Sequence, residues 1–173
     1  MPYKDLAAFR RSYRTKEGCF AHKRSHNLLR DYKEYQSVKN VLKDEAPKTL
    51  AKFKELKYNN SEQYKQVKRE QTTITKVKNK GWTQDFIDKA ISLYYDLRKK
   101  GIEATDHGLA RILSRNIQIA DIVQIHQKPF NYCQPDGKKI KFYNHMAIIY
   151  TDDEKEIVSV IKRKTVKDDW NEI

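Results

Sequence analysis

The chain of 173 residues carries 36 Lys and Arg against 23 Asp and Glu, a formal net charge of +13. Only 38% of its residues are hydrophobic, below the roughly 45–50% typical of globular domains, which predicts a small core. The longest uncharged apolar run, 146–150, is too short to span a membrane, and the polar start carries no secretory signal. Two cysteines make no disulfide framework, so we expect a reducing cytoplasm.

The positive charge is concentrated in the first half of the chain. Residues 1–80 hold 21 Lys and Arg and 9 Asp and Glu, whereas residues 81–173 hold 15 and 14. Longer apolar segments begin near Gly81. We therefore predict a basic helical arm over residues 1–80 and a compact α+β domain over 81–173, with the boundary between residues 75 and 82.

The arm shows narrow apolar stripes at helical spacing. The first stripe consists of Leu28, Tyr32, Tyr35 and Leu42, and Pro47 ends that segment. A second helix is expected from about Leu50, with Thr49 as its cap. Such narrow stripes suit burial against a partner or another subunit better than a self-sufficient core.

Basic residues interleaved with aromatic rings crowd the start of the arm. The candidate nucleic-acid-binding residues are Arg10, Arg11, Arg14, Lys23, Arg24 and Arg30. Lys and Arg release counterions when they contact phosphates, and rings can stack on bases. The pattern predicts contact with RNA or DNA, and a solvated helical face is the alternative.

Cys19, His22 and His26 form a Cys-x2-His-x3-His pattern in the same stretch. A closed zinc site needs four ligands, and no nearby Cys or His supplies the fourth. The pattern therefore favours ordinary surface histidines, and we predict neither a metal site nor a cofactor.

The second part predicts three helices followed by strands. The first helix is capped by Thr83 and ends before Gly101, the second begins near Thr105 and ends near Ser114, and the third covers about 119–127. Strands are expected over 140–143, 145–150 and Glu156–Lys162. In the last strand Ile157 and Ser159 alternate with Val158 and Val160. Helices before an antiparallel meander indicate an α+β fold.

His107, Arg111 and Arg115 are spaced four residues apart, which places them on one helix face. A histidine can move a proton to or from a ribose hydroxyl, and guanidinium groups can bind phosphate. No metal is needed when the nucleophile is the 2′-hydroxyl of RNA. The competing interpretation is a solvated helix face, which spacing alone favours.

Residues from about 105 to the end resemble small RNase toxin domains of the barnase–EndoU–colicin–RelE superfold. The resemblance rests on His107-x3-Arg111-x3-Arg115, the segment 117–122, Asp136-Gly137-Lys138 and the strand Glu156–Lys162. It implies that His107 is the general acid or base and that Arg111 and Arg115 bind phosphate. Ser159, at a position where the family often has threonine, would contact phosphate, with Lys162 as an additional cation.

The segment 47–58 and the terminal segment 162–170 resemble minor head proteins of tailed phages of Gram-positive bacteria. Some of those proteins carry toxin-like RNase domains at their C-terminal ends, so the two resemblances agree. They imply a phage virion or bacterial host cytoplasm as the location, and portal or capsid proteins as partners.

Three functions remain open from the sequence. The first is a metal-independent RNase, the second is a phage structural or ejected protein that binds nucleic acid without cutting it, and the third is an interaction module with a relic fold. Of the other histidines, His126 is expected to be structural, whereas His145 would join the site only if it shared the face of Ser159.

Overall fold

The protein divides into two compact units. The computed structural model describes the backbone of residues 16–59 and 61–173, and the side chains of residues 26–59 and 62–173. The units are Met1–Thr72 and Thr73–Ile173. The division falls inside helix α4 (Ser61–Asn79), and the buried Ile74 and Val77 lie in the part of α4 that belongs to the second unit.

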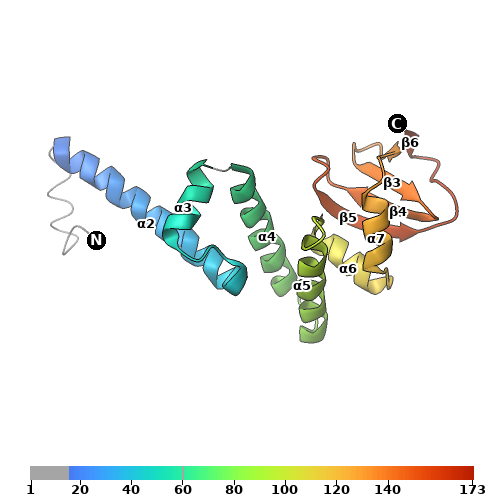
Figure 1. Ribbon diagram of the computed structural model, residues 1–173, viewed down its shortest axis with the longest axis horizontal. Coiled ribbons are helices and arrows are strands. Elements are labelled where there is room, and N and C mark those ends of the chain that lie inside the picture. The colour runs from blue at the N-terminus through green and yellow to red at the C-terminus, as the bar shows by residue number, and fades with distance from the viewer. Residues whose placement is uncertain (1–15, 60) are drawn as a thin grey trace. The chain divides into compact units, whose positions relative to one another are not determined.

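The first unit is built from helices, as the sequence predicts (Figure 1). Helix α2 (Lys16–Leu42) continues into the short 3-10 helix η1 (Lys43–Glu45), and α3 (Leu50–Asn59) and the first part of α4 follow. Thr49 caps α3, since its Oγ1 accepts the backbone N–H of Lys52 at 3.1 Å.

The buried stripe of α2 differs from the predicted one. Tyr35, Val38 and Leu42 are buried and Phe53 of α3 packs with Tyr35, with ring centroids 5.8 Å apart. Leu28 and Tyr32 belong to the predicted stripe, but each is 49% exposed. The charged Asp31 lies on the buried face of α2 in their place, and burial of Leu28 and Tyr32 against a partner or another subunit stays a prediction.

The second unit contains a mixed sheet, which confirms the α+β class. Six strands are found among the described residues, in the spatial order β1-β5-β4-β3-β2-β6. Strand β1 runs parallel to β5, and the other neighbouring pairs are antiparallel. The strands are β1 (Glu103–Ala104), β2 (Tyr132–Cys133), β3 (Lys139–Tyr143), β4 (Met146–Tyr150), β5 (Glu156–Lys162) and β6 (Asn171–Glu172).

Three helices accompany this sheet, namely α5 (Gln84–Arg98), α6 (Asp106–Ser114) and α7 (Ile119–His126). Helix α6 begins where the sequence predicts, because Thr105 Oγ1 accepts the Gly108 N–H at 3.1 Å. The Thr105 N–H also donates to the Ile157 carbonyl at 3.0 Å, which fixes the start of α6 against β5. Figure 1 shows α6 and α7 beside the strands that they contact.

A bulge in β5 decides which side chains share a face of the sheet. Tyr150 pairs with Ile157, but its neighbour Ile149 pairs with Ser159, so Val158 is the extra residue. Side chains of paired residues point to the same face, so Ile157 and Ser159 lie on opposite faces. The predicted alternation was therefore wrong at this point.

Candidate functional site

His107 and Arg111 lie side by side on the exposed face of α6. The Arg111 Nε–H donates to His107 Nε2 at 3.2 Å, which places the ring proton of a neutral imidazole on Nδ1. The i,i+4 spacing predicts this contact. Both side chains are exposed, whereas Leu109 and Ile112 on the other face of the helix are buried.

The pair lines an open hollow of about 480 Å³, here called the α6 depression. Its other walls include the ring of Trp82, which meets the Phe86 ring edge-on with centroids 5.0 Å apart. The depression is lined by Gly81, Trp82, Thr83, Phe86, His107, Ala110, Arg111 and Ser114. It thus combines an imidazole, a guanidinium and aromatic surface, the groups that bind a phosphate and stack on a base.

The Arg115 side chain is bonded to the sheet. Its Nη1 donates to the carbonyl oxygen of Val160 in β5, and the side chain is half-buried. Burial and then the nearby Arg111 guanidinium lower the pKa of Arg115. Arg115 does not line the α6 depression, because this hydrogen bond ties it to the sheet.

Ser159 and Lys162 also lie apart from the α6 depression. Ser159 pairs with Ile149, which belongs to the cluster around Trp170, whereas α7 packs on the face of Tyr150. Lys162 lines a second cavity. Of the five predicted residues, the structure therefore brings together His107 and Arg111 at the α6 depression, and the β5 bulge accounts for the position of Ser159.

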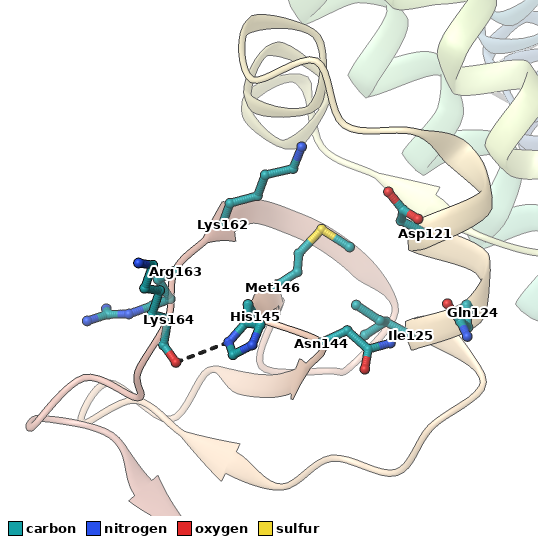
Figure 2. A pocket seen from close by; sticks show the side chains of 9 residues that line it. All are labelled: Asp121, Gln124, Ile125, Asn144, His145, Met146, Lys162, Arg163 and Lys164. Atoms are coloured by element: carbon teal, nitrogen blue, oxygen red, sulfur yellow. Dashed lines mark hydrogen bonds between the residues drawn. The ribbon is translucent and has the colours of Figure 1, made fainter.

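The second cavity has a volume of about 410 Å³ and opens where β4 and β5 meet α7 (Figure 2). We call it the sheet-end cavity. The His145 ring donates from Nδ1 to the Lys164 carbonyl oxygen at 3.2 Å, which leaves Nε2 unengaged by this bond. The cavity is lined by Asp121, Gln124, Ile125, Asn144, His145, Met146, Lys162, Arg163 and Lys164.

A buried lysine lies under the end of α7. Lys141 is 7% exposed, donates to the His126 carbonyl oxygen at 2.5 Å, and has its Nζ 4.6 Å from the centroid of the Phe130 ring. Burial lowers the pKa of Lys141, and burial and the Lys141 charge lower the pKa of His126. His126 Nδ1 lies 2.8 Å from the hydroxyl of the buried Tyr150, which agrees with the structural role expected for this histidine.

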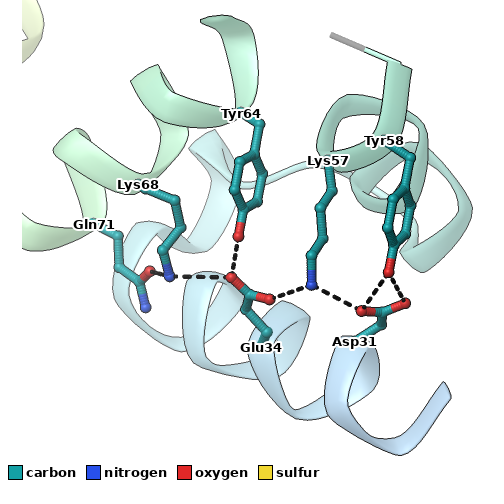
Figure 3. A network of polar contacts seen from close by, with 7 residues as sticks. All are labelled: Asp31, Glu34, Lys57, Tyr58, Tyr64, Lys68 and Gln71. Atoms are coloured by element: carbon teal, nitrogen blue, oxygen red, sulfur yellow. Dashed lines mark hydrogen bonds and ion pairs between the residues drawn. The ribbon is translucent and has the colours of Figure 1, made fainter. Parts of the chain in front are cut away.

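The first unit contains a network of charged side chains that joins three helices (Figure 3). Lys57 of α3 donates to Asp31 at 2.8 Å and to Glu34 at 2.7 Å, both on α2. Tyr58 donates to Asp31, and Tyr64 of α4 donates to Glu34. Burial and the hydrogen bond to Glu34 raise the pKa of Tyr64 to about 12. Because the charges are paired with one another, we interpret the network as structural.

Most of the predicted nucleic-acid-binding residues lie outside the described side chains. This holds for Arg10, Arg11, Arg14, Lys23 and Arg24. Arg30 is described and is exposed on α2. Of the Cys-x2-His-x3-His pattern, only the exposed His26 is described, and the described part of the chain contains no group of three or more candidate metal ligands.

Sequence reasoning missed the aromatic wall of the α6 depression and most of the sheet-end cavity. Trp82 stands directly before the cap Thr83, so its sequence position suggests only a packing role at a helix start. Asn144 lies in a turn and Gln124 lies on a helix, twenty residues apart in the sequence. No local pattern predicts that they line the same cavity.

Comparison of the chain with protein-family models, curated proteins and solved structures gave no match. The resemblances to RNase toxin domains and to phage minor head proteins therefore stay predictions from the sequence. Among the described helices, none has both the length and the apolar character needed to cross a bilayer.

Proposed function

We propose that the second unit is a metal-independent endoribonuclease that binds and cleaves RNA at the α6 depression, within a protein of the phage head. The observation that carries the proposal is the exposed His107–Arg111 pair, whose side-chain nitrogens are 3.2 Å apart, beside the rings of Trp82 and Phe86. In this proposal one base of the RNA stacks on the rings, and the phosphate next to that base binds Arg111.

The chemistry follows from the hydrogen bond between the two side chains. A phosphate that binds Arg111 competes for its Nε–H and frees the lone pair on His107 Nε2. That nitrogen then accepts the proton of the 2′-hydroxyl while the 2′-oxygen attacks phosphorus and the bond to the 5′-oxygen breaks. The leaving 5′-oxygen takes a proton from water, and the resulting hydroxide takes the proton from His107 Nε2, so the products are a 2′,3′-cyclic phosphate, a 5′-hydroxyl end and the neutral imidazole.

Cleavage of a short single-stranded RNA by the full chain in excess EDTA tests this proposal. His107→Ala should reduce the rate by about 10²–10⁴-fold, the usual contribution of general acid–base catalysis. His26→Ala is the matched control, because it makes the same change at an exposed histidine of the first unit. A 2′-deoxy substitution at the cleaved nucleotide should abolish the reaction.

Equal cleavage by the parent and by His107→Ala would overturn the proposal, as would no cleavage of single-stranded RNA, tRNA or total RNA by the parent. The second of these results, no cleavage by the parent, would leave the second candidate function, nucleic-acid binding without cleavage. It is favoured by Arg115, which bonds to Val160, and by Ser159, which lies away from the α6 depression.

The proposed setting is a phage virion or the cytoplasm of the bacterial host, with RNA or DNA and the portal or capsid proteins as partners. Its support is the resemblance of segments 47–58 and 162–170 to minor head proteins, together with the basic first half of the chain. Crosslinking within virions, followed by identification of the peptides joined to residues 1–80, tests the portal and capsid contacts.

A further inference from the structure

The sheet-end cavity lies apart from the α6 depression and shares no lining residue with it. Its volume of about 410 Å³ falls within the roughly 300–1,000 Å³ typical of small-molecule sites. The cavity has an apolar floor, amide groups at the side and cations at the rim, and the carboxylate of Asp121 lies across it from Lys162 (Figure 2).

The floor of the cavity is apolar. Ile125 of α7 and Met146 of β4 line it and are 2% and 4% exposed, respectively. Figure 2 shows the Met146 side chain between Lys162 on one side of the cavity and Asp121 on the other. A flat ring is well suited to such a floor, because Met and Ile adapt to a planar apolar face and the thioether contacts aromatic rings favourably.

Amide groups stand beside this floor. The exposed Asn144 and Gln124 line the cavity from the turn before β4 and from α7. A carboxamide offers both donors and an acceptor, so the pair can match the mixed donor and acceptor edge of a nucleobase.

The cations lie at the rim where β5 ends. Lys162 and Lys164 are exposed, whereas Arg163 donates to the Thr165 carbonyl and lies over the Trp170 ring. Lys162 and Lys164 are therefore the cations left for a ligand, and both suit a phosphate group.

His145 is held at the rim by an unusual backbone conformation. Asn144 and His145 have φ angles of 51° and 59°, in the two-residue turn between β3 and β4. Such turns strongly prefer glycine at the second position, so a histidine there is strained. The bond from its Nδ1 to the Lys164 carbonyl holds the ring at the cavity.

We propose that the sheet-end cavity binds a nucleoside monophosphate unit, with the base on Met146 and Ile125 and the phosphate at Lys162 and His145. Asn144 and Gln124 contact the edge of the base. This assignment does not depend on the proposed RNase activity, because the residues that carry it lie outside the α6 depression.

Titration of the full chain with AMP and UMP, followed by NMR shifts of backbone amides, tests the proposal. The nucleotides should shift the amides of residues 144–146 and 162–164, and uridine and inorganic phosphate should each bind more weakly. Lys162→Met should weaken nucleotide binding by about tenfold, the loss expected for one charge-assisted contact. Asp121→Asn should strengthen it, because it removes a negative charge that faces the phosphate.

Lys128→Met is the matched control, since Lys128 is exposed just beyond α7 and does not line the cavity. It should leave unchanged the affinity measured at the amides of residues 144–146 and 162–164. A short RNA that binds more tightly than the mononucleotide, with the same sensitivity to Lys162→Met, would identify the unit as part of an RNA chain. Equal affinity would identify a free nucleotide.

Three results would overturn the assignment. The first is no shift of these amides with any nucleotide, and the second is equal affinity for inorganic phosphate and AMP. The third is nucleotide binding that Lys162→Met leaves unchanged.

Discussion

Gly108 lies where the backbone of α6 closely approaches the backbone of β5. A Cβ atom at this position would lie 2.2 Å from the Ile157 carbonyl oxygen, which is backbone and has little freedom to move. The same contact fixes α6, the helix that presents His107 and Arg111. Because Gly108 has no side chain, the helix that carries the candidate site can lie this close to β5.

Gly108→Ala should destabilise the second unit by about 1–3 kcal/mol, the usual cost of overpacking. The sign makes the test specific, because Gly to Ala inside a helix normally stabilises by roughly 0.5–1 kcal/mol. Trp82 and Trp170, the chain's two tryptophans, both lie in the second unit, so tryptophan fluorescence during urea unfolding measures the change. Ser92→Ala, at an exposed position of α5, is the control. A midpoint for Gly108→Ala equal to or above that of the parent would refute the close-contact argument.

At the residue scale, the sequence predicts which residues are neighbours on one helix better than it predicts on which face of the sheet a side chain lies. Four residues between His107 and Arg111 are enough to place them together on a helix. The alternation of Ile157 with Ser159 was predicted wrongly because one extra residue, Val158, puts them on opposite faces, and a bulge has no signature in the hydrophobic pattern. The hydrogen bond of Arg115 could not be predicted, because its partner is a backbone carbonyl, which any residue supplies.

Lys57 acts at the scale of elements, because it holds two acidic residues of α2 against α3. Asp31 is 3% and Lys57 16% exposed in their side chains, so loss of the cation leaves carboxylates that water reaches poorly. Lys57→Met should therefore cost about 3–5 kcal/mol, as for a broken buried ion pair. Lys52→Met is the matched control, since the Lys52–Glu55 pair is 55% exposed on both sides, and such exposed pairs contribute about 0–1 kcal/mol.

Thermal unfolding followed by far-UV circular dichroism measures this difference, because α2, α3 and α4 supply much of the helix in the chain. Equal effects of the two substitutions would show that the network contributes no more than an exposed ion pair.

The same network gives the first unit a dependence on acid pH. Burial acts to raise the pKa of Asp31, but hydrogen bonds from Lys57 and Tyr58 outweigh it, and the pKa is lowered. Glu34 behaves in the same way, with burial opposed by hydrogen bonds from Lys57 and Tyr64. A carboxyl group whose folded pKa is lowered stabilises the fold above its ordinary pKa of about 4, and this stability is lost as the pH falls further.

Helix content should therefore be constant from neutral pH to about pH 5 and should fall below about pH 4. Asp31→Asn removes one of the two groups, so its free energy of unfolding should change less over this range than that of the parent. An acid titration by circular dichroism at several urea concentrations gives both curves. Parallel curves for the two proteins would contradict the predicted role of Asp31.

The elements that the sequence predicts are those with local signals. Thr83 and Thr105 cap helices α5 and α6 as expected, and β3, β4 and β5 lie close to their predicted ranges. The strands β1, β2 and β6 were missed because each has two residues and forms only through pairing with a distant strand. The burial of Asp31 on α2 was not predicted, because it depends on ion pairing, which hydropathy does not show.

At the scale of the whole molecule, charge and candidate chemistry occupy different parts of the chain. The excess of basic residues lies within residues 1–80, whereas the α6 depression and the sheet-end cavity lie in the nearly neutral remainder. If the basic first part binds a phosphate backbone, its contribution will appear as dependence on salt. The chemical step at His107 will depend on salt far less, since a proton transfer within a bound complex releases no counterions.

The combined variant Lys23→Ala, Arg24→Ala, Arg30→Ala tests this separation. If all three contact phosphates, the slope of log K against log salt on single-stranded RNA should become shallower by about two, since each contact contributes about 0.7. Its cleavage rate at saturating protein and low salt should match that of the parent. His107→Ala should show the reverse, with an unchanged slope and slower cleavage. A triple variant with the parent's slope would remove these three residues from the binding surface, and slower cleavage at saturation would show that the basic part takes part in the chemical step.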